Sequence, residues 1–288
     1  MTSSFQPATL ARAFLTTFGL VALAACSAPG ESAVPTDDSA GPISSTCTVA
    51  APPAYYGNAP FELDLTFYTQ SCEIAGVPIV ASANVDPAAL QVTAEIVATM
   101  MTPLSQTERD GMRSIALRVG VIGENEVTTD MPEYADLNDV FPGTDWDGAT
   151  RGLGATPARP LTSSGEENLL CLAGDPYFAE NILIHEFSHT VHEYGVVAGD
   201  PTFQGRLDAA YDAAMNAGLW SKTYGATNST EYWAEGVQSY FEVNGSASPA
   251  DGIHNDVDTR AELQSYDAAL YALVDEVFAG ATIDPPCP

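Results

Sequence analysis

Apolar and polar residues follow one another in patterns that predict both strands and helices. Apolar or alternating runs at residues 61–68 and 77–83, and a β-branched run at 115–122, predict strands. Asp86 and Pro87 have the side chains of a helix N-cap and first helical residue, so a helix is expected from there to Met101. The Gly-, Pro- and Asp-rich stretch at 130–164 predicts mostly loop.

Helices dominate the second half of the expected structure. Asp175-Pro176 predicts the start of one helix, Asp200-Pro201 opens another that Gly218 closes, and residues 260–279 predict a last one. The predicted fold class is therefore α+β, one domain over residues 61–288 with a small N-terminal sheet and a helix-rich C-terminal half. A weaker expectation is an edge strand at residues 166–172 that aligns an extended peptide.

The N-terminus predicts an export signal. An apolar run at residues 13–25 is too short to span a bilayer, and it ends in Leu23-Ala24-Ala25-Cys26. This ending resembles the bacterial lipoprotein signal, in which Cys26 is lipidated; a plain secretory signal is the alternative. The expected organisation is a signal peptide over 1–26 and a flexible tether over 27–60. The protein is then expected in the bacterial cell envelope, outside the cytoplasm, at the outer membrane or released.

The net charge of the chain limits the classes of molecule that it can bind. The 288 residues include 38 Asp and Glu against 9 Lys and Arg, a formal net charge of -29. Such a chain repels a phosphate backbone, which excludes nucleic acid, and it also excludes a polybasic membrane anchor. Membrane contact is expected through the lipid alone. The hydrophobic share of 45% is enough to build a core.

Five cysteines fit an oxidising compartment. If Cys26 carries lipid, four remain, and four cysteines allow two disulfides in three connectivities. The predicted pairs are Cys47–Cys72 and Cys171–Cys287.

The segment from Asn181 to His189 contains the pattern HExxH. Histidines four residues apart lie on one helix face, so His185 and His189 can hold one Zn²⁺ ion. Glu186 stands beside the first of them, where it can take a proton from water as a general base. Two histidines that merely pack in a core are the structural alternative.

A third ligand must come from elsewhere in the chain. The metzincin pattern fails, because His192 and Gly195 stand where it requires glycine and histidine. Glu231 and Glu235 lie four residues apart in an aromatic and apolar stretch, where carboxylates are poorly explained as a solvated face. Glu231 is assigned as the ligand, and Glu235 is expected to hydrogen-bond a ligating histidine. The reverse assignment and two surface carboxylates are the alternatives.

These two segments resemble a known family. The run from His185 to Tyr194 is similar to the HEFxHxVxxY helix of the anthrax lethal factor catalytic domain, and residues 224–235 are similar to its YGxTNxxE motif followed by two aromatics, Ala and Glu. Pro-Pro endopeptidases belong to the same broader group. The resemblance implies a gluzincin-type fold, peptide-bond hydrolysis and Glu231 as zinc ligand. It also implies that Tyr224 donates to the transition state, although an aromatic residue here can equally belong to the core.

The other candidate side chains carry weaker expectations. His192 is expected to pack near the site rather than bind metal, and His254 has no motif around it. Gly152-Leu153-Gly154 is too short a pattern for nucleotide binding. The acidic stretch at 124–133 is expected to be a solvated loop, with a calcium site as the alternative.

The sequence therefore predicts a secreted, lipid-anchored zinc metallopeptidase acting on a peptide or protein. Two alternatives remain: a zinc-binding surface lipoprotein without catalysis, and a hydrolase of a non-peptide amide such as one in the cell wall.

Overall fold

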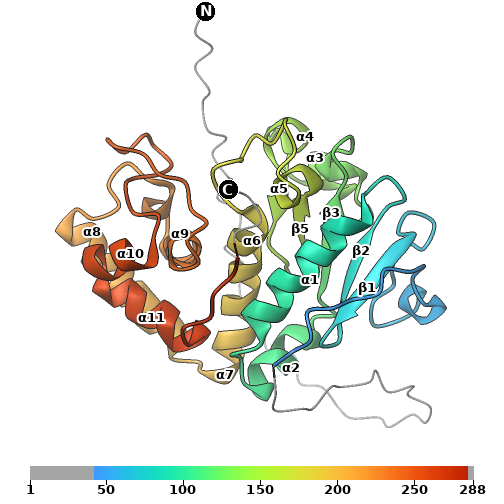
Figure 1. Cartoon of the computed structure of the whole chain (residues 1–288), viewed down its shortest axis with the longest axis horizontal. Coiled ribbons are helices and arrows are strands. Elements are labelled where there is room, and N and C mark those ends of the chain that lie inside the picture. The colour runs from blue at the N-terminus through green and yellow to red at the C-terminus, as the bar shows by residue number, and fades with distance from the viewer. Residues whose placement is uncertain (1–41, 285–288) are drawn as a thin grey trace, which may run out of the picture.

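A five-stranded sheet and a group of C-terminal helices lie on opposite sides of one central helix in the computed structural model, which describes residues 42–284 (Figure 1). The predicted signal peptide, its Cys26, and the first part of the predicted tether lie outside the described residues. All five strands fall before residue 166, and long helices follow it. The α+β class with a helix-rich C-terminal half is thus confirmed.

The sheet mixes parallel and antiparallel pairs. Its strands, in spatial order, are β1 (Gln70–Ile74), β2 (Val77–Ala81), β3 (Arg118–Ile122), β5 (Leu161–Gly165) and β4 (Gly152–Leu153). β1 and β2 form an antiparallel hairpin, β2, β3 and β5 run parallel, and β4 pairs antiparallel with β5 at the edge. β5 and β4, at this edge of the sheet, are the strands that pack against the central helix.

Two strand predictions need correction. Residues 61–68 form turns rather than a strand, because the Asp64 carboxylate accepts a hydrogen bond from the Thr66 backbone N–H and curls the chain locally. β5 lies inside the stretch predicted as loop. Its Thr162, Ser163 and Ser164 are polar yet fully buried, so they carry no apolar strand pattern.

The first long helix is the predicted one. α1 spans Pro87–Met101, and the side chain of Asp86 caps it by accepting from the Ala88 backbone N–H. It packs on the sheet. The shorter helices of this half are η1 (Ala54–Gly57), α2 (Gln106–Ser114), η2 (Thr128–Asp130), η3 (Pro132–Tyr134), α3 (Leu137–Val140), α4 (Trp146–Ala149) and α5 (Glu166–Leu169). Since α5 is helical, the predicted edge strand at 166–172 is wrong.

The central helix starts later than predicted. α6 spans Ile182–Thr190 and is capped by the Asn181 side chain, whereas Asp175 closes a turn with the Tyr177 backbone N–H. The chain continues as a π-helix, η4 (Val191–Val196). The remaining helices are α7 (Val197–Gly199), α8 (Phe203–Ala217), η5 (Tyr224–Ala226), α9 (Ser229–Tyr240), α10 (Arg260–Tyr266) and α11 (Ala268–Phe278). Gly218 closes α8 at a φ of 77°, as predicted.

The last predicted helix is two helices. Asp267 separates α10 from α11, and its carboxylate caps α11 at the Leu270 N–H. The same carboxylate accepts from Trp220 Nε1 and Tyr232 Oη. Because the buried Asp267 carboxylate accepts hydrogen bonds from three donors, it fixes the break between α10 and α11.

The folded body extends upstream of the predicted boundary at residue 61. Cys47 is buried and disulfide-bonded to Cys72, Ala50 pairs with Ser71, and Tyr56 is buried. Residues from Cys47 onward are therefore part of the domain and not of a tether. Cys171 is also disulfide-bonded, while its predicted partner Cys287 lies outside the described residues, so that pairing stays a prediction.

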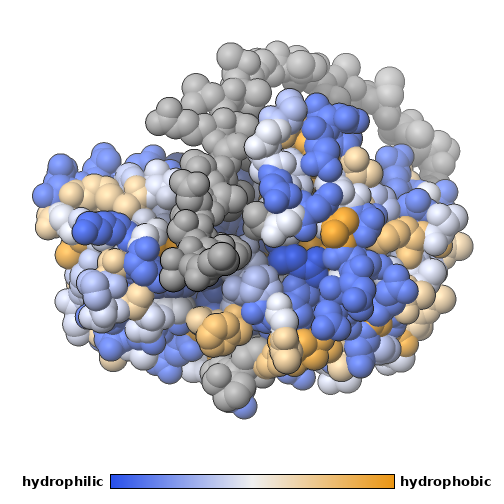
Figure 2. Space-filling model, turned by 90° about the horizontal axis from the view of Figure 1, so that it is seen from above, coloured by the Kyte–Doolittle hydropathy of each residue, from blue (hydrophilic) through white to orange (hydrophobic). Residues whose placement is uncertain are grey.

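Arginines in the described residues are held by the protein itself. Five of them pair with carboxylates: Arg113 with Asp110, Arg118 with Glu133, Arg151 with Glu167, Arg159 with Asp136, and Arg206 with Asp200 and Glu276. Arg109 and Arg260 donate to backbone carbonyls. The face of the molecule seen in Figure 2 is mostly hydrophilic, with apolar residues in small spots. No helix among residues 42–284 has both the length and the apolar character to span a membrane.

Candidate metal centre

Helices α6 and α9 bring the two sequence motifs together. Leu183, Ile184 and Phe187 bury the apolar side of α6 in the core. The Asn228 side chain caps α9 by accepting from the backbone N–H groups of Thr230 and Glu231. The Trp233 indole donates to the Ser188 carbonyl over 3.0 Å, which fixes α9 against α6. The first turn of α9 therefore faces the HExxH segment.

His185, His189 and Glu231 meet at one point. The Oε2 atom of Glu231 lies 3.1 Å from His185 Nε2 and 3.3 Å from His189 Nε2. One potential ligand atom from each residue lies within 4.8 Å of the others, and this is the one such group found in the described part of the chain. Two imidazole nitrogens and a carboxylate oxygen are a donor set that zinc takes in proteins. The residues therefore fit a Zn²⁺ ion.

The pKa values of His185 and Glu231 are shifted because these side chains lie close together. Burial lowers the pKa of His185, but the hydrogen bond with Glu231 and the charges of Glu186, Glu231 and Glu235 outweigh it and raise the pKa to about 10. Burial raises the pKa of Glu231, but the charge of His189 and the hydrogen bonds of both histidines outweigh it and lower the pKa. Without metal, the His185 imidazole is thus protonated and the Glu231 carboxylate is ionised, and a hydrogen bond links them.

Gln238, which the sequence analysis missed, holds His185 from the other side. His185 Nδ1 lies 2.8 Å from Gln238 Oε1, and Gln238 Nε2 donates to Glu180 Oε2 (3.1 Å) and the Asn181 carbonyl (3.2 Å). Because the Gln238 amide nitrogen faces two acceptors, its oxygen must face Nδ1, and Nδ1 must carry a proton. The Nε2 lone pair of a neutral His185 is then free for a metal. The spacing of Gln238 from Glu231, seven residues on one helix face, is the signal that could have found it.

Glu235 does not take the role predicted for it. Its Oε1 lies 3.8 Å from His185 Nδ1, beyond hydrogen-bond distance, and its Oε2 instead accepts from Asn244. Burial raises the pKa of Glu235 to about 7, against the lowering charge of His185. Glu235 therefore supports the site electrostatically while Gln238 orients the ring.

Glu186 lies between the two histidines and the sheet edge. Burial raises its pKa, against the lowering charges of His185 and His189. Gly152 and Gly154 allow the close approach of β4 to α6: a Cβ at Gly152 would lie 2.5 Å from Ile182 Cγ2, and one at Gly154 would lie 3.4 Å from His189 Cβ. The two glycines thus serve packing beside the site, in agreement with the rejection of a nucleotide motif.

Tyr224 lies beside His185. The two ring centroids are 6.1 Å apart. Burial, followed by the charges of Glu231 and Glu186, raises the pKa of Tyr224, so the phenol keeps its proton at neutral pH. A protonated phenol beside the three metal-binding side chains can donate a hydrogen bond to a developing oxyanion.

The remaining histidines stand apart from the three converging atoms. His192 is 2% exposed and packs against the rings of Phe203 and Trp233, and burial lowers its pKa to about 4. His254 Nε2 lies 3.6 Å from Glu180 Oε2. Neither belongs to the metal-binding group found among the described residues.

The acidic stretch at 124–133 is not simply solvated. Glu126 is buried and accepts from Ser82, Asn84 and the Gly123 backbone N–H. Glu133 pairs with Arg118 and accepts from the Tyr68 hydroxyl. These carboxylates are occupied by protein donors, which corrects the expectation of a solvated loop and gives no support to a calcium site.

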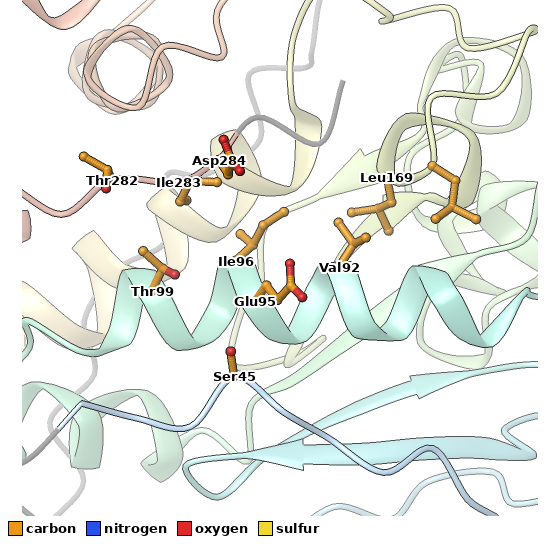
Figure 3. A pocket seen from close by; sticks show the side chains of 10 residues that line it. Ser45, Val92, Glu95, Ile96, Thr99, Leu169, Thr282, Ile283 and Asp284 are labelled. Atoms are coloured by element: carbon orange, nitrogen blue, oxygen red, sulfur yellow. The ribbon is translucent and has the colours of Figure 1, made fainter. Parts of the chain in front are cut away.

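A cavity borders the three converging side chains. A cavity of about 240 Å³ is lined by all three converging side chains together with Glu186 and an apolar wall. A larger one, of about 550 Å³, lies between α1, α5 and residues 282–284 (Figure 3). Its polar lining includes the carboxylates of Glu95 and Asp284, and none of the HExxH residues reach it.

Comparisons with known proteins give one structural neighbour to report. No family model matches the sequence, and no curated protein matches it either. Among solved structures, the chain is similar to a Pro-Pro endopeptidase from Paenibacillus alvei, with 16% identity and a TM-score of 0.40 over 65% of this chain and 90% of that one.

Proposed function

We propose that the protein is a zinc-dependent peptidase that is exported and held at the bacterial cell envelope by lipid on Cys26. One observation carries the enzymatic part of the proposal: a single carboxylate oxygen of Glu231 lies within 3.3 Å of the Nε2 atoms of His185 and His189. Burying two imidazoles and an acid together is costly unless a shared ligand compensates. A divalent ion supplies that compensation.

In this proposal the metal ligands, the general base and the hydrogen-bond donor to the oxyanion are different side chains. His185, His189 and Glu231 hold the Zn²⁺ ion, which when bound supplies a Lewis acid that polarises a carbonyl and acidifies water. Glu186 accepts the proton of the attacking water and returns it to the leaving nitrogen, and its raised pKa suits both transfers. Tyr224 donates to the oxygen that becomes negatively charged.

The test separates metal binding from catalysis. Purified protein should contain one zinc per chain by elemental analysis and should cleave casein or a peptide library, and a chelator should stop cleavage. Glu186→Gln should retain zinc while cleavage falls by about 10²–10⁴-fold. Glu193→Gln is the matched control, because Glu193 lines the same cavity but lies outside the metal-binding group, and it should cleave within a few-fold of wild type.

The outcomes also separate the alternatives. Zinc binding with no cleavage of any peptide would favour the non-catalytic surface lipoprotein. Cleavage of a cell-wall amide but of no peptide would favour the amide hydrolase. Full activity of Glu186→Gln would remove the proposed general base.

A further inference from the structure

His254 lies in the loop between α9 and α10, and hydrogen bonds to the backbone hold this loop beside the metal centre. The Asp251 carboxylate accepts from the backbone N–H groups of Ile253 and His254, each over 2.9 Å. The Ile253 carbonyl accepts from the Tyr224 backbone N–H over 2.7 Å. The loop that carries His254 is therefore fixed to the segment that carries Tyr224.

The His254 side chain is enclosed and faces one acid. It is 12% exposed and packs against Gly245, where a Cβ would lie 2.6 Å from His254 Cε1. Its Nε2 atom lies 3.6 Å from Glu180 Oε2 and has no hydrogen bond within residues 42–284. At this distance the contact is an ion pair rather than a hydrogen bond.

The charges around the pair favour a cation facing an anion. Burial lowers the pKa of His254, but contact with Glu180 and the charges of Glu180, Glu235 and Asp251 outweigh burial and raise it. Burial raises the pKa of Glu180, but contact with His254 and the charges of His254 and His185 outweigh burial and lower it. Each partner thus stabilises the charged form of the other.

The charge of Glu180 decides how the Gln238 amide is oriented. An ionised carboxylate only accepts hydrogen bonds, whereas a protonated carboxyl can also donate. As a carboxylate, Glu180 accepts from Gln238 Nε2 over 3.1 Å, which leaves the Gln238 oxygen 2.8 Å from His185 Nδ1. A protonated Glu180 would let the amide turn and present its nitrogen to Nδ1. His185 would then carry its proton on Nε2, the nitrogen that a metal needs.

We propose that His254 is a positioning residue of the metal centre: paired with Glu180, it keeps Gln238 in the orientation that leaves Nε2 of His185 available to a metal ion. The inference rests on the proposed function, because it concerns the same site. His254 acts on the ligand through two intermediate side chains and touches neither metal nor substrate.

Zinc affinity at pH 7.5, measured by competition with a chelating dye, tests the pair. His254→Gln leaves Glu180 without its cation and should weaken zinc binding about 10-fold. Adding Glu180→Gln removes the unpaired acid and keeps an acceptor for Gln238, so the double variant should bind within about threefold of wild type. Asp256→Asn is the matched control, because Asp256 is exposed on the same loop, and it should bind zinc as wild type does.

Two results with these variants would contradict the proposal. Unchanged zinc affinity of His254→Gln would show that His254 does not act on the site. A loss of affinity that Glu180→Gln does not restore would show that His254 only packs, because neutralising Glu180 cannot replace packing against Gly245.

Nitrogen NMR of wild-type protein labelled in its four histidines gives a second measurement that does not depend on the folding of a variant. Both ring nitrogens of His254 should carry protons at pH 7, and His185 should carry its proton on Nδ1 when zinc is bound. A neutral His254, or zinc bound through Nδ1 of His185, would overturn the proposal. Absence of zinc binding by wild type would instead defeat the proposed function, and the protonation of His254 can still be read in metal-free protein.

Discussion

The Nδ1 atom of His185 lies 2.8 Å from the side-chain oxygen of Gln238, and the side-chain nitrogen of Gln238 donates to Glu180. This chain of contacts fixes which imidazole nitrogen faces Glu231. Gln238→Leu should therefore weaken zinc binding by about 10- to 100-fold, as measured by competition with a chelating dye. Glu235→Gln is the control and should change zinc affinity less, because Glu235 Oε1 is 3.8 Å from Nδ1.

A charge swap distinguishes orientation from general packing. Gln238→Glu alone would set two carboxylates against each other at the Glu180 contact. Combining Gln238→Glu with Glu180→Gln restores one donor and one acceptor there, and zinc affinity should recover most of the loss. If Gln238→Leu bound zinc as wild type does while Glu235→Gln did not, Glu235 would be the orienting group after all.

Replacing Tyr224 with Phe should slow hydrolysis without releasing the metal. The phenol keeps its proton because burial and nearby carboxylates raise its pKa. Losing one donor to an oxyanion typically lowers kcat about 10²–10³-fold. Peptide cleavage rates and zinc content of Tyr224→Phe, measured together, check this. Undiminished kcat would assign Tyr224 to the core alone.

Zinc binding should expel a proton from His185. The pKa of His185 is raised to about 10 in the metal-free protein, so its imidazole is charged at pH 7.5, whereas a metal ligand must be neutral. About one proton per ion should be released, and affinity should rise with pH until the pKa of His185 is reached. Calorimetry in two buffers of different ionisation enthalpy measures the release, and equal heats would argue against it.

Removing the Cys47–Cys72 disulfide should destabilise the domain. The bond joins residues 25 apart in sequence and ties the N-terminal segment to β1. Cys47→Ser combined with Cys72→Ser should lower the free energy of unfolding by roughly 2–4 kcal/mol. Urea denaturation of variant and wild type gives the difference. A variant as stable as wild type would mean that this segment contributes little.

The parts of the site that could be predicted are those with a periodic signature. A spacing of four residues identifies His185 and His189 as neighbours on α6, and a carboxylate inside an apolar helix stands out at Glu231. Gln238 carries no charge, so its one signal in the sequence is the spacing of seven residues from Glu231 on the same helix face. That spacing gives a position but no role, which depends on contacts with His185 and Glu180 from distant parts of the chain.

The sequence patterns predict the wrong structure at two places where tertiary contacts, rather than local sequence, determine the fold. The hydroxyl of Thr162 is satisfied by Thr190 and that of Ser163 by Tyr134, so the middle of β5 is buried although its side chains are polar. Likewise the Ala-, Pro- and Ser-rich composition before residue 61 is typical of a linker. A disulfide at Cys47 anchors it to the domain instead.

Because the arginines are paired within the fold, the negative charge of the protein acts on other molecules as they approach. Since seven of the nine basic residues are engaged by the protein's own carboxylates and carbonyls, little cationic character remains to offset the excess of acids outside. Anionic lipid headgroups and acidic polymers meet repulsion within about one Debye length, near 8 Å at physiological ionic strength, while basic peptides are drawn in. The net charge of the protein therefore favours the approach of basic molecules over acidic ones before any contact forms.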